Sequence, residues 1–212
     1  MAIKAILFDF DGTLLNTNEL ILQSFYHVFE ERNPGKYQKE DFLKYNGPSL
    51  YQSFNELTPG EEEEMIRRYR IFNDANHDRL VTHYDGVKEM IEQLHQKGIR
   101  MAIVSSKIHK NILRGLRVLN IEHLMECIVG ADDVEHVKPH PEPIEKALQQ
   151  LGIEKHEAIM VGDNSHDIEG GKNAGVLTAG VAWSIKGEAY LQALQPDYML
   201  KHLSDLLTIV SE

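Results

Sequence analysis

Short apolar runs alternate with segments of helical periodicity, and this alternation constrains the fold of the 212-residue chain more than any other feature. The apolar runs are typical of buried strands, and the segments between them place apolar residues three and four positions apart. Such an order predicts an α/β fold, in which helices cover both faces of a parallel sheet. We expect strands at residues 5–8, 99–104, 127–131, 158–162 and 177–183, with a sixth near residue 197.

Helices are expected between these strands, over the segments GVKEMIEQLHQKG, KNILRGLRVLN and PEPIEKALQQLG, with Gly98 and Gly152 as helix stops. One region breaks the alternation. From Asn16 to Leu80 there is no convincing strand, only helical stretches such as NELILQSFYHVFEER. The sequence therefore predicts a core domain of residues 1–15 and 81–212 and an inserted helical domain of residues 16–80, which we expect to stand over the end of the first strand.

Composition and charge exclude several classes of protein. The formal net charge of -11 argues against a surface for nucleic acid or for an anionic membrane, and no apolar segment is long enough to span a bilayer. The single cysteine, Cys127, rules out an internal disulfide and is interpreted as a core residue. We expect a soluble cytoplasmic protein, and the acidic surface is compatible with a monomer or a dimer.

Polar side chains follow the predicted strands where each strand ends. Asp9 and Asp11 come one residue apart at the end of the first strand, so their carboxylates share a face and repel each other unless a cation lies near them. The carboxyl ends of parallel strands meet at one edge, so we expect a single pocket there. Later strands and loops add further polar residues to that edge: Ser105, Ser106, Lys138, Asp163 and Asp167.

Several carboxylates and one lysine suit a hard divalent cation together with an anionic substrate. Mg²⁺ prefers oxygen ligands in near-octahedral geometry, whereas the sequence has neither the acid spacing of a calcium loop nor the Cys/His spacing of a zinc site. His136 and His140 flank Lys138 and are interpreted as solvated loop residues rather than ligands. The predicted cofactor is therefore Mg²⁺.

In their order along the chain, DFDGT, a strand ending in Ser, Lys-Pro and GDNSHD resemble the motifs of the haloacid dehalogenase (HAD) superfamily. These motifs span residues 9 to 167, and the insertion after the first of them resembles the helical C1 cap of that superfamily. The resemblance implies a Rossmann-like core with an inserted cap domain. It also implies a Mg²⁺-dependent phosphohydrolase that forms an aspartyl-phosphate intermediate.

By the same resemblance, Asp9 is the nucleophile and Asp11 the general acid/base. Ser105 would hydrogen-bond the transferring phosphoryl group, and Lys138 would offset charge on the nucleophile and the phosphate. The implied Mg²⁺ ligands are Asp9, the backbone carbonyl of Asp11, Asp163 and, directly or through water, Asp167. A receiver-type signalling domain combines similar residues in another order, and a true dehalogenase does not need Asp11 or a metal, so both alternatives are disfavoured.

The substrate is less constrained, because the cap selects the leaving group. Phosphoglycolate phosphatases, other small phosphomonoester phosphatases and β-phosphoglucomutases share the architecture and remain alternatives. The similarity is closer to the bacterial inorganic pyrophosphatases of the superfamily, through NTNELI, GPSL and DDVEHVKP, and it implies pyrophosphate as the small phosphorylated substrate. The candidate substrate-binding residues are Gly12, Ser106, Asn46, Gly47 and Ser49, with Arg70 and His77 as weaker candidates.

Overall fold

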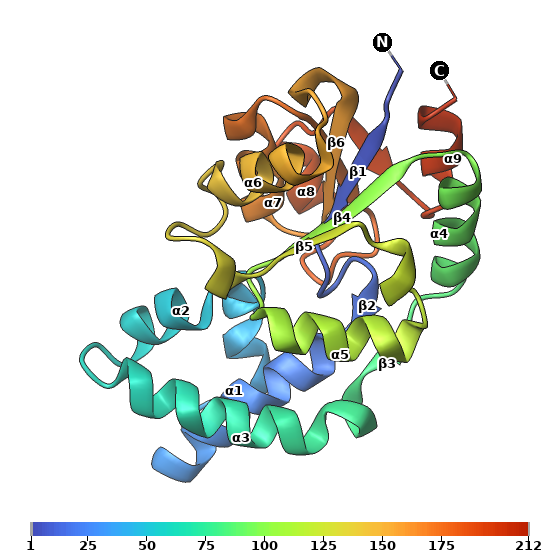
Figure 1. Cartoon of the computed structure of the whole chain (residues 1–212). Coiled ribbons are helices and arrows are strands. Elements are labelled where there is room, and N and C mark those ends of the chain that lie inside the picture. Colours follow the sequence, from blue (N-terminus) through green and yellow to red (C-terminus); the bar gives the residue numbers. More distant parts are fainter. Residues whose placement is uncertain (1, 212) are drawn as a thin grey trace. The chain divides into compact units, whose positions relative to one another are not determined.

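The computed structural model describes residues 2–211, and the chain forms two compact units (Figure 1). The core unit comprises the chain up to Leu15 and again from His83 onward, and the helical unit comprises Asn16–Thr82. Two-residue strands β2 (Leu15–Asn16) and β3 (Thr82–His83) pair with each other where the chain passes between the units. Two residues are too few to show an alternating apolar pattern, so the sequence does not predict these strands.

A six-stranded parallel sheet forms the centre of the core unit, in the order β5-β4-β1-β6-β7-β8. The first strand, β1 (Ala5–Phe8), lies between β4 and β6, and its Ala5 pairs with Arg100 on one side and Ala158 on the other. The predicted α/β fold is confirmed. The other strands are β4 (Arg100–Val104), β5 (Cys127–Val129), β6 (Ala158–Gly162), β7 (Leu177–Val181) and β8 (Tyr198–Leu200).

Three of these strands are shorter than the apolar runs that predicted them. β5 ends at Val129, because Gly130 begins the short 3₁₀ helix η3 (Ala131–Asp133). β7 ends at Val181, after which the chain turns, and β4 begins at Arg100, after the turn at Gly98. An apolar run therefore includes residues that are buried or half-buried without belonging to the sheet.

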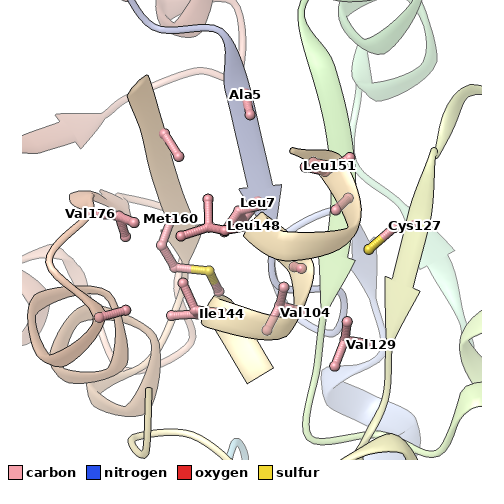
Figure 2. Close-up of a cluster of buried hydrophobic side chains, with 14 residues drawn as sticks. Ala5, Leu7, Val104, Cys127, Val129, Ile144, Leu148, Leu151, Met160 and Val176 are labelled. Carbon is pink, nitrogen blue, oxygen red and sulfur yellow. The ribbon is translucent and has the colours of Figure 1, made fainter. Parts of the chain in front are cut away.

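Alternate residues of the strands form an apolar layer beneath helix α6 (Glu142–Leu151). Leu7, Val104 and Met160 lie in one cluster with Ile144 and Leu148 of α6 (Figure 2). Side chains two apart along a strand share a face, so every second residue contributes to this layer. Cys127 belongs to the same cluster, and burial raises the pKa of its thiol to about 11, which confirms its prediction as a core residue.

The helices of the core unit follow from their apolar spacing and their caps. In α4 (Val87–Gln96), the buried residues Val87, Met90, Ile91 and Leu94 recur at helical spacing. α6 ends at Gly152, which has a left-handed φ of 62°, and Gly98 adopts a φ of 78° after α4, so both predicted helix stops are confirmed. The remaining helices of this unit are α5 (His109–Leu119), η2 (Glu122–Leu124), η4 (Lys155–Glu157), α7 (Ser165–Ala174), α8 (Glu188–Ala193) and α9 (Asp205–Ile209).

The helical unit is built around aromatic side chains. Phe25 lies within 4.9–5.9 Å, between ring centroids, of four other rings: Phe42, Tyr45, Phe54 and Tyr69. Large rings bury much apolar surface with few residues, and this suits a unit of only 67 residues. Those helices are α1 (Asn18–Arg32), η1 (Lys39–Tyr45), α2 (Leu50–Leu57) and α3 (Glu62–Leu80).

No helix within residues 2–211 is both long enough and apolar enough to cross a bilayer.

Candidate active site

Asp9 follows β1 directly and is placed by the sheet itself. Its backbone N–H donates to the carbonyl of Val161 at 2.8 Å, so the ladder between β1 and β6 continues through this residue. The side chain is buried at the carboxyl edge of the sheet. Burial, together with the nearby Asp167 and Asp11 carboxylates, outweighs the attraction of Lys138 and raises the pKa of Asp9 to about 7.

Lys138 provides the buried cation of the site. Its Nζ donates to Asp9 Oδ1 at 2.9 Å, to Asp167 Oδ1 at 2.6 Å and to the carbonyl of Val104 at 2.6 Å. Burial alone would disfavour the ammonium, but the carboxylates of Asp167 and Asp9 more than compensate and raise the pKa of Lys138 above its usual range. All three donor positions of the ammonium are thus used to join the ends of three chain segments.

Asp163 and Asp167 come from the turn between β6 and α7. Asp167 lies in the first turn of α7, and its Oδ2 accepts the backbone N–H of Asn164 at 3.0 Å, as expected for an acid near a helix N-terminus. Asp163 is also buried, and burial followed by repulsion from Asp9 and Asp167 raises its pKa well above the usual value. Candidate ligand oxygens of Asp9, Asp163 and Asp167 all lie within 4.8 Å of one another.

Two glycines allow these acids to approach the backbone. A Cβ at Gly12, whose φ is +80°, would come within 2.3 Å of Asp163 Oδ2, and a Cβ at Gly162 would come within 2.2 Å of Asp167 Cγ. Any side chain at either position would therefore displace a carboxylate. The structure gives Gly12 this backbone role, while substrate binding by Gly12 stays a prediction.

The remaining predicted residues of the core unit lie at the same strand ends. Ser105 is buried after β4, and its Oγ accepts the backbone N–H of Lys107 at 3.3 Å. Ser106 follows it and is half-buried. The side chain of Asp11 contacts Lys107, whose Nζ lies 2.7 Å from Asp11 Oδ1. A second lysine therefore stands beside the second acid of the DFDGT motif.

The family of the chain can be stated from this framework and a sequence comparison. A model of the haloacid dehalogenase-like hydrolases matches residues 6–181, a range that includes the ends of β1, β4 and β6 and all the acids described above. The chain belongs to this family. It is accordingly a hydrolase, as its motifs predicted.

Similar proteins match this family member over nearly its whole length. A protein of Halalkalibacterium halodurans named pyrophosphatase PpaX is 52% identical over 99% of this chain and 98% of its own length. A protein of the same name from Bacillus cereus (strain AH820) is 49% identical over 100% of this chain and 98% of its own. Among solved structures, a predicted phosphoglycolate phosphatase from Haemophilus somnus has a TM-score of 0.84 at 23% identity, covers 98% of this chain and 97% of its own, and shows the same fold.

The candidates in the helical unit have local structural roles in this hydrolase. Asn46 is buried and donates to Asn18 Oδ1 at 2.7 Å, and Ser49 is the N-cap of α2, where its Oγ accepts the N–H of Gln52. Gly47 has a positive φ of 119°. Of the two weaker candidates, Arg70 is exposed and His77 is buried. Their part in substrate binding stays a prediction.

Sequence reasoning missed three polar residues of the site. Lys107 ends the SSK sequence, where only the two hydroxyls were considered. Ser184 lies after β7, and its Oγ donates to the backbone carbonyl of Asp163 at 2.7 Å. Lys186 follows it, half-buried, and burial lowers the pKa of its ammonium although Asp163 and Asp167 oppose this. The available signal was the pair of polar residues Ser184 and Lys186 directly after the apolar run at residues 177–183, the same kind of signal that identified the other strand ends.

Proposed function

We propose that the chain is a Mg²⁺-dependent phosphohydrolase that hydrolyses inorganic pyrophosphate through an aspartyl-phosphate on Asp9. The observation that carries the proposal is the buried group in which Lys138 binds both Asp9 and Asp167 at the carboxyl edge of the sheet. The choice of pyrophosphate is supported by the relatives named pyrophosphatase PpaX, which match along the whole chain. We place the activity in the cytoplasm, in keeping with a single buried thiol.

The residues present fit a hard divalent cation. Three buried carboxylates converge on one ammonium, and the raised pKa values of Asp9 and Asp163 show that Lys138 alone does not compensate their burial and mutual repulsion, so a bound cation would favour the ionised acids. Oxygen donors of this kind suit Mg²⁺. Asp9, Asp163, Asp167 and the backbone carbonyl of Asp11 would hold it. When bound, Mg²⁺ supplies positive charge that favours the approach of an anionic phosphoryl group to a carboxylate.

In the first half of the reaction, a carboxylate oxygen of Asp9 attacks phosphorus, and the bond from phosphorus to the bridging oxygen breaks. The phosphoryl group is transferred to Asp9 and the other phosphate leaves. Lys138 offsets charge on Asp9 and on the transferred group, and the Ser105 hydroxyl donates to a phosphoryl oxygen. Asp11 donates a proton to the leaving oxygen where the leaving group requires one.

In the second half, water attacks the phosphorus of the aspartyl-phosphate. Asp11 accepts a proton from this water, the acyl-phosphate bond breaks, and the Asp9 carboxylate is regenerated as the second phosphate departs. Pyrophosphate makes a modest demand on Asp11, because a departing phosphate is a far weaker base than a departing alkoxide. The Lys107 ammonium beside Asp11 adds positive charge for a departing phosphate.

The helical unit is the cap domain in this proposal, and it selects the leaving group. Its turn at Asn46, Gly47 and Ser49 supplies polar groups for the second phosphate, while Gly12 and Ser106 complete the substrate-binding set of the core unit. A charge-assisted hydrogen bond of this kind contributes roughly 1.5–3 kcal/mol, enough to distinguish a phosphate from a carboxylate of another shape.

A substrate panel tests the proposal. The purified protein with Mg²⁺ is given pyrophosphate, phosphoglycolate, β-glucose 1-phosphate and p-nitrophenyl phosphate, and kcat/KM is measured for each. Pyrophosphate should exceed phosphoglycolate by at least about tenfold, which requires about 1.4 kcal/mol of differential transition-state stabilisation. Chelation with EDTA should abolish every activity, and added Mg²⁺ should restore it. A phosphoglycolate or sugar phosphate preference would overturn pyrophosphate as the substrate, and turnover after complete chelation would overturn the metal.

A further inference from the structure

A second group of converging ligand side chains lies on the loop that carries Lys138. His136, His140 and Glu142 each place one ligand atom within 4.8 Å of the others. The Nδ1 atom of His136 lies 3.0 Å from Glu142 Oε2, and the Nδ1 atom of His140 lies 3.9 Å from the same oxygen. Among residues 2–211, the buried acids of the active site form the other such group. The two histidines therefore have a third ligand that their spacing did not reveal.

We propose that His136, His140 and Glu142 form a binding site for a transition-metal ion of the Zn²⁺ class, separate from the acids at the sheet edge. Two imidazoles and one carboxylate are a donor set that Zn²⁺ and Co²⁺ prefer and that Mg²⁺ does not. In a tetrahedral site with bonds of about 2.0–2.1 Å, ligand atoms stand roughly 3.3 Å apart. The two measured separations, 3.0 and 3.9 Å, lie on either side of this value.

The carboxylate of the group is held in place by the backbone. Glu142 Oε1 accepts the N–H of Glu135 at 2.8 Å, and Oε2 accepts the N–H of His136 at 2.9 Å. The hydrogen bond from the Glu135 N–H is the largest cause that lowers the pKa of Glu142, and the bond from the His136 N–H acts in the same direction. The Glu142 carboxylate is therefore ionised at neutral pH. Pro139 and Pro141 restrict the backbone between the ligands, which reduces the entropy lost when a metal orders them.

The Nδ1 atoms of both imidazoles already contact Glu142. His140 Nδ1 accepts the backbone N–H of Glu142 at 3.2 Å, and a metal bound there would replace this hydrogen bond. His136 Nδ1 lies 3.0 Å from Glu142 Oε2, and a metal bound to these two atoms would replace their hydrogen bond, with the ring proton of His136 on Nε2. The ring centroids of His136 and His140 lie 4.6 Å apart. Their side chains are 62% and 50% exposed, so an ion has direct access from solvent, and water can complete its coordination.

Zn²⁺ titration of the full-length, tag-free protein tests the site. Calorimetry at neutral pH, with excess Mg²⁺ added to compete with Zn²⁺ for the acids at the sheet edge, should show one equivalent of bound Zn²⁺. The double variant His136→Asn/His140→Asn should lose that equivalent or bind it at least tenfold more weakly. A matched double variant, His123→Asn/His156→Asn, removes two exposed histidines outside the group and should retain it.

A second variant and a second metal guard against misinterpretation. Glu142→Gln keeps one oxygen, which can accept one of the two backbone N–H groups, but removes the charge, so it should weaken Zn²⁺ binding while both histidines remain. Co²⁺ bound to the wild-type protein should give the visible absorption of a four-coordinate ion, and the His136/His140 variant should not. Absence of Zn²⁺ binding by the wild-type protein, or equal binding by the His136/His140 variant, would overturn the proposal. The binding readout is independent of phosphatase activity and so of the proposed function.

Discussion

The two units of the molecule differ in whether the charged side chains named here are buried or lie on the surface. At the sheet edge of the core unit, Asp9, Asp163 and Lys138 are buried, and the pKa values of the two acids are raised. In the helical unit, ion pairs such as Arg67 with Glu64 and Lys44 with Glu56 lie on the surface, and the interior is aromatic. The difference shows where the fold loses stability in order to perform chemistry, because buried like charges destabilise a fold until a cation binds between them.

The largest effect is expected at Asp9, where a substitution should lower kcat strongly without changing the fold. Asp9→Asn keeps the size of the side chain but removes the attacking oxygen charge, so kcat for pyrophosphate should fall by about a thousandfold or more. Circular dichroism should show an unchanged fold. The exposed Asp74→Asn in the helical unit is the matched control and should keep its activity. Substantial phosphate release by folded Asp9→Asn protein would remove Asp9 from the role of nucleophile.

In the aromatic interior of the helical unit, we expect a substitution to lower the stability of the fold instead of removing a reacting group. Phe25→Ala removes a fully buried ring that contacts four others and should lower the free energy of unfolding by about 3–5 kcal/mol. Urea denaturation measures the change. Tyr51→Ala, at a side chain that is 60% exposed, should have little effect. A small loss for Phe25→Ala would mean that the unit does not depend on its aromatic packing.

A smaller and pH-dependent effect is expected at Asp163. Its raised pKa means that the unfolded chain releases this proton at lower pH than the folded protein does, so the contribution of Asp163 to the stability of the metal-free protein is lost as pH rises above about 4. Asp163→Asn removes that loss. Without metal at pH 8, the melting temperature of the variant should be a few degrees above that of the wild type. Near pH 3.5 the two melting temperatures should be the same, because Asp163 is protonated in both the folded and the unfolded wild-type protein. A lower melting temperature at pH 8 would contradict the argument.

The smallest effect is expected on the surface of the helical unit. Arg67 binds Glu64 through Nε and through a second nitrogen, both at 2.8 Å, but the pair is exposed and screened by solvent. Arg67→Gln should therefore leave the melting temperature and the activity unchanged. A clear loss of stability would show that exposed ion pairs stabilise the helical unit. The two units would then differ less in how far charged side chains affect their stability.

The sequence predicts features whose cause is local. The strand at residues 5–8 and the helix ended by Gly152 are confirmed because apolar spacing and a left-handed glycine act over a few residues. Contacts between distant segments carry no such signal. The ion pair of Lys107 with Asp11 joins residues 96 positions apart, and the bond from Ser184 to the Asp163 carbonyl depends on how β7 lies beside β6.

The histidines show the same limit within a short segment. HVKPHPE gives the spacing of His136 and His140 but not the turn that brings Glu142 between them. In the helical unit, the turn NGPSL suggested ligand contacts, whereas Asn46 and Ser49 have structural partners within that unit. Polar residues in a turn serve the fold and a ligand with the same chemistry, and spacing alone does not separate the two.

The central place of β1 in the sheet has a consequence for synthesis of the chain. Ala5–Phe8 is made first, yet its neighbours are β4, which begins at Arg100, and β6, which ends at Gly162. At about 5–20 residues per second, the ribosome needs roughly 8 to 30 s to add the second neighbour after the first strand has emerged. Until then the first strand lacks at least one of its two partners. The acids of the active site therefore assemble only after the chain has been translated through Asp167, and a nascent chain released before this residue has no complete centre.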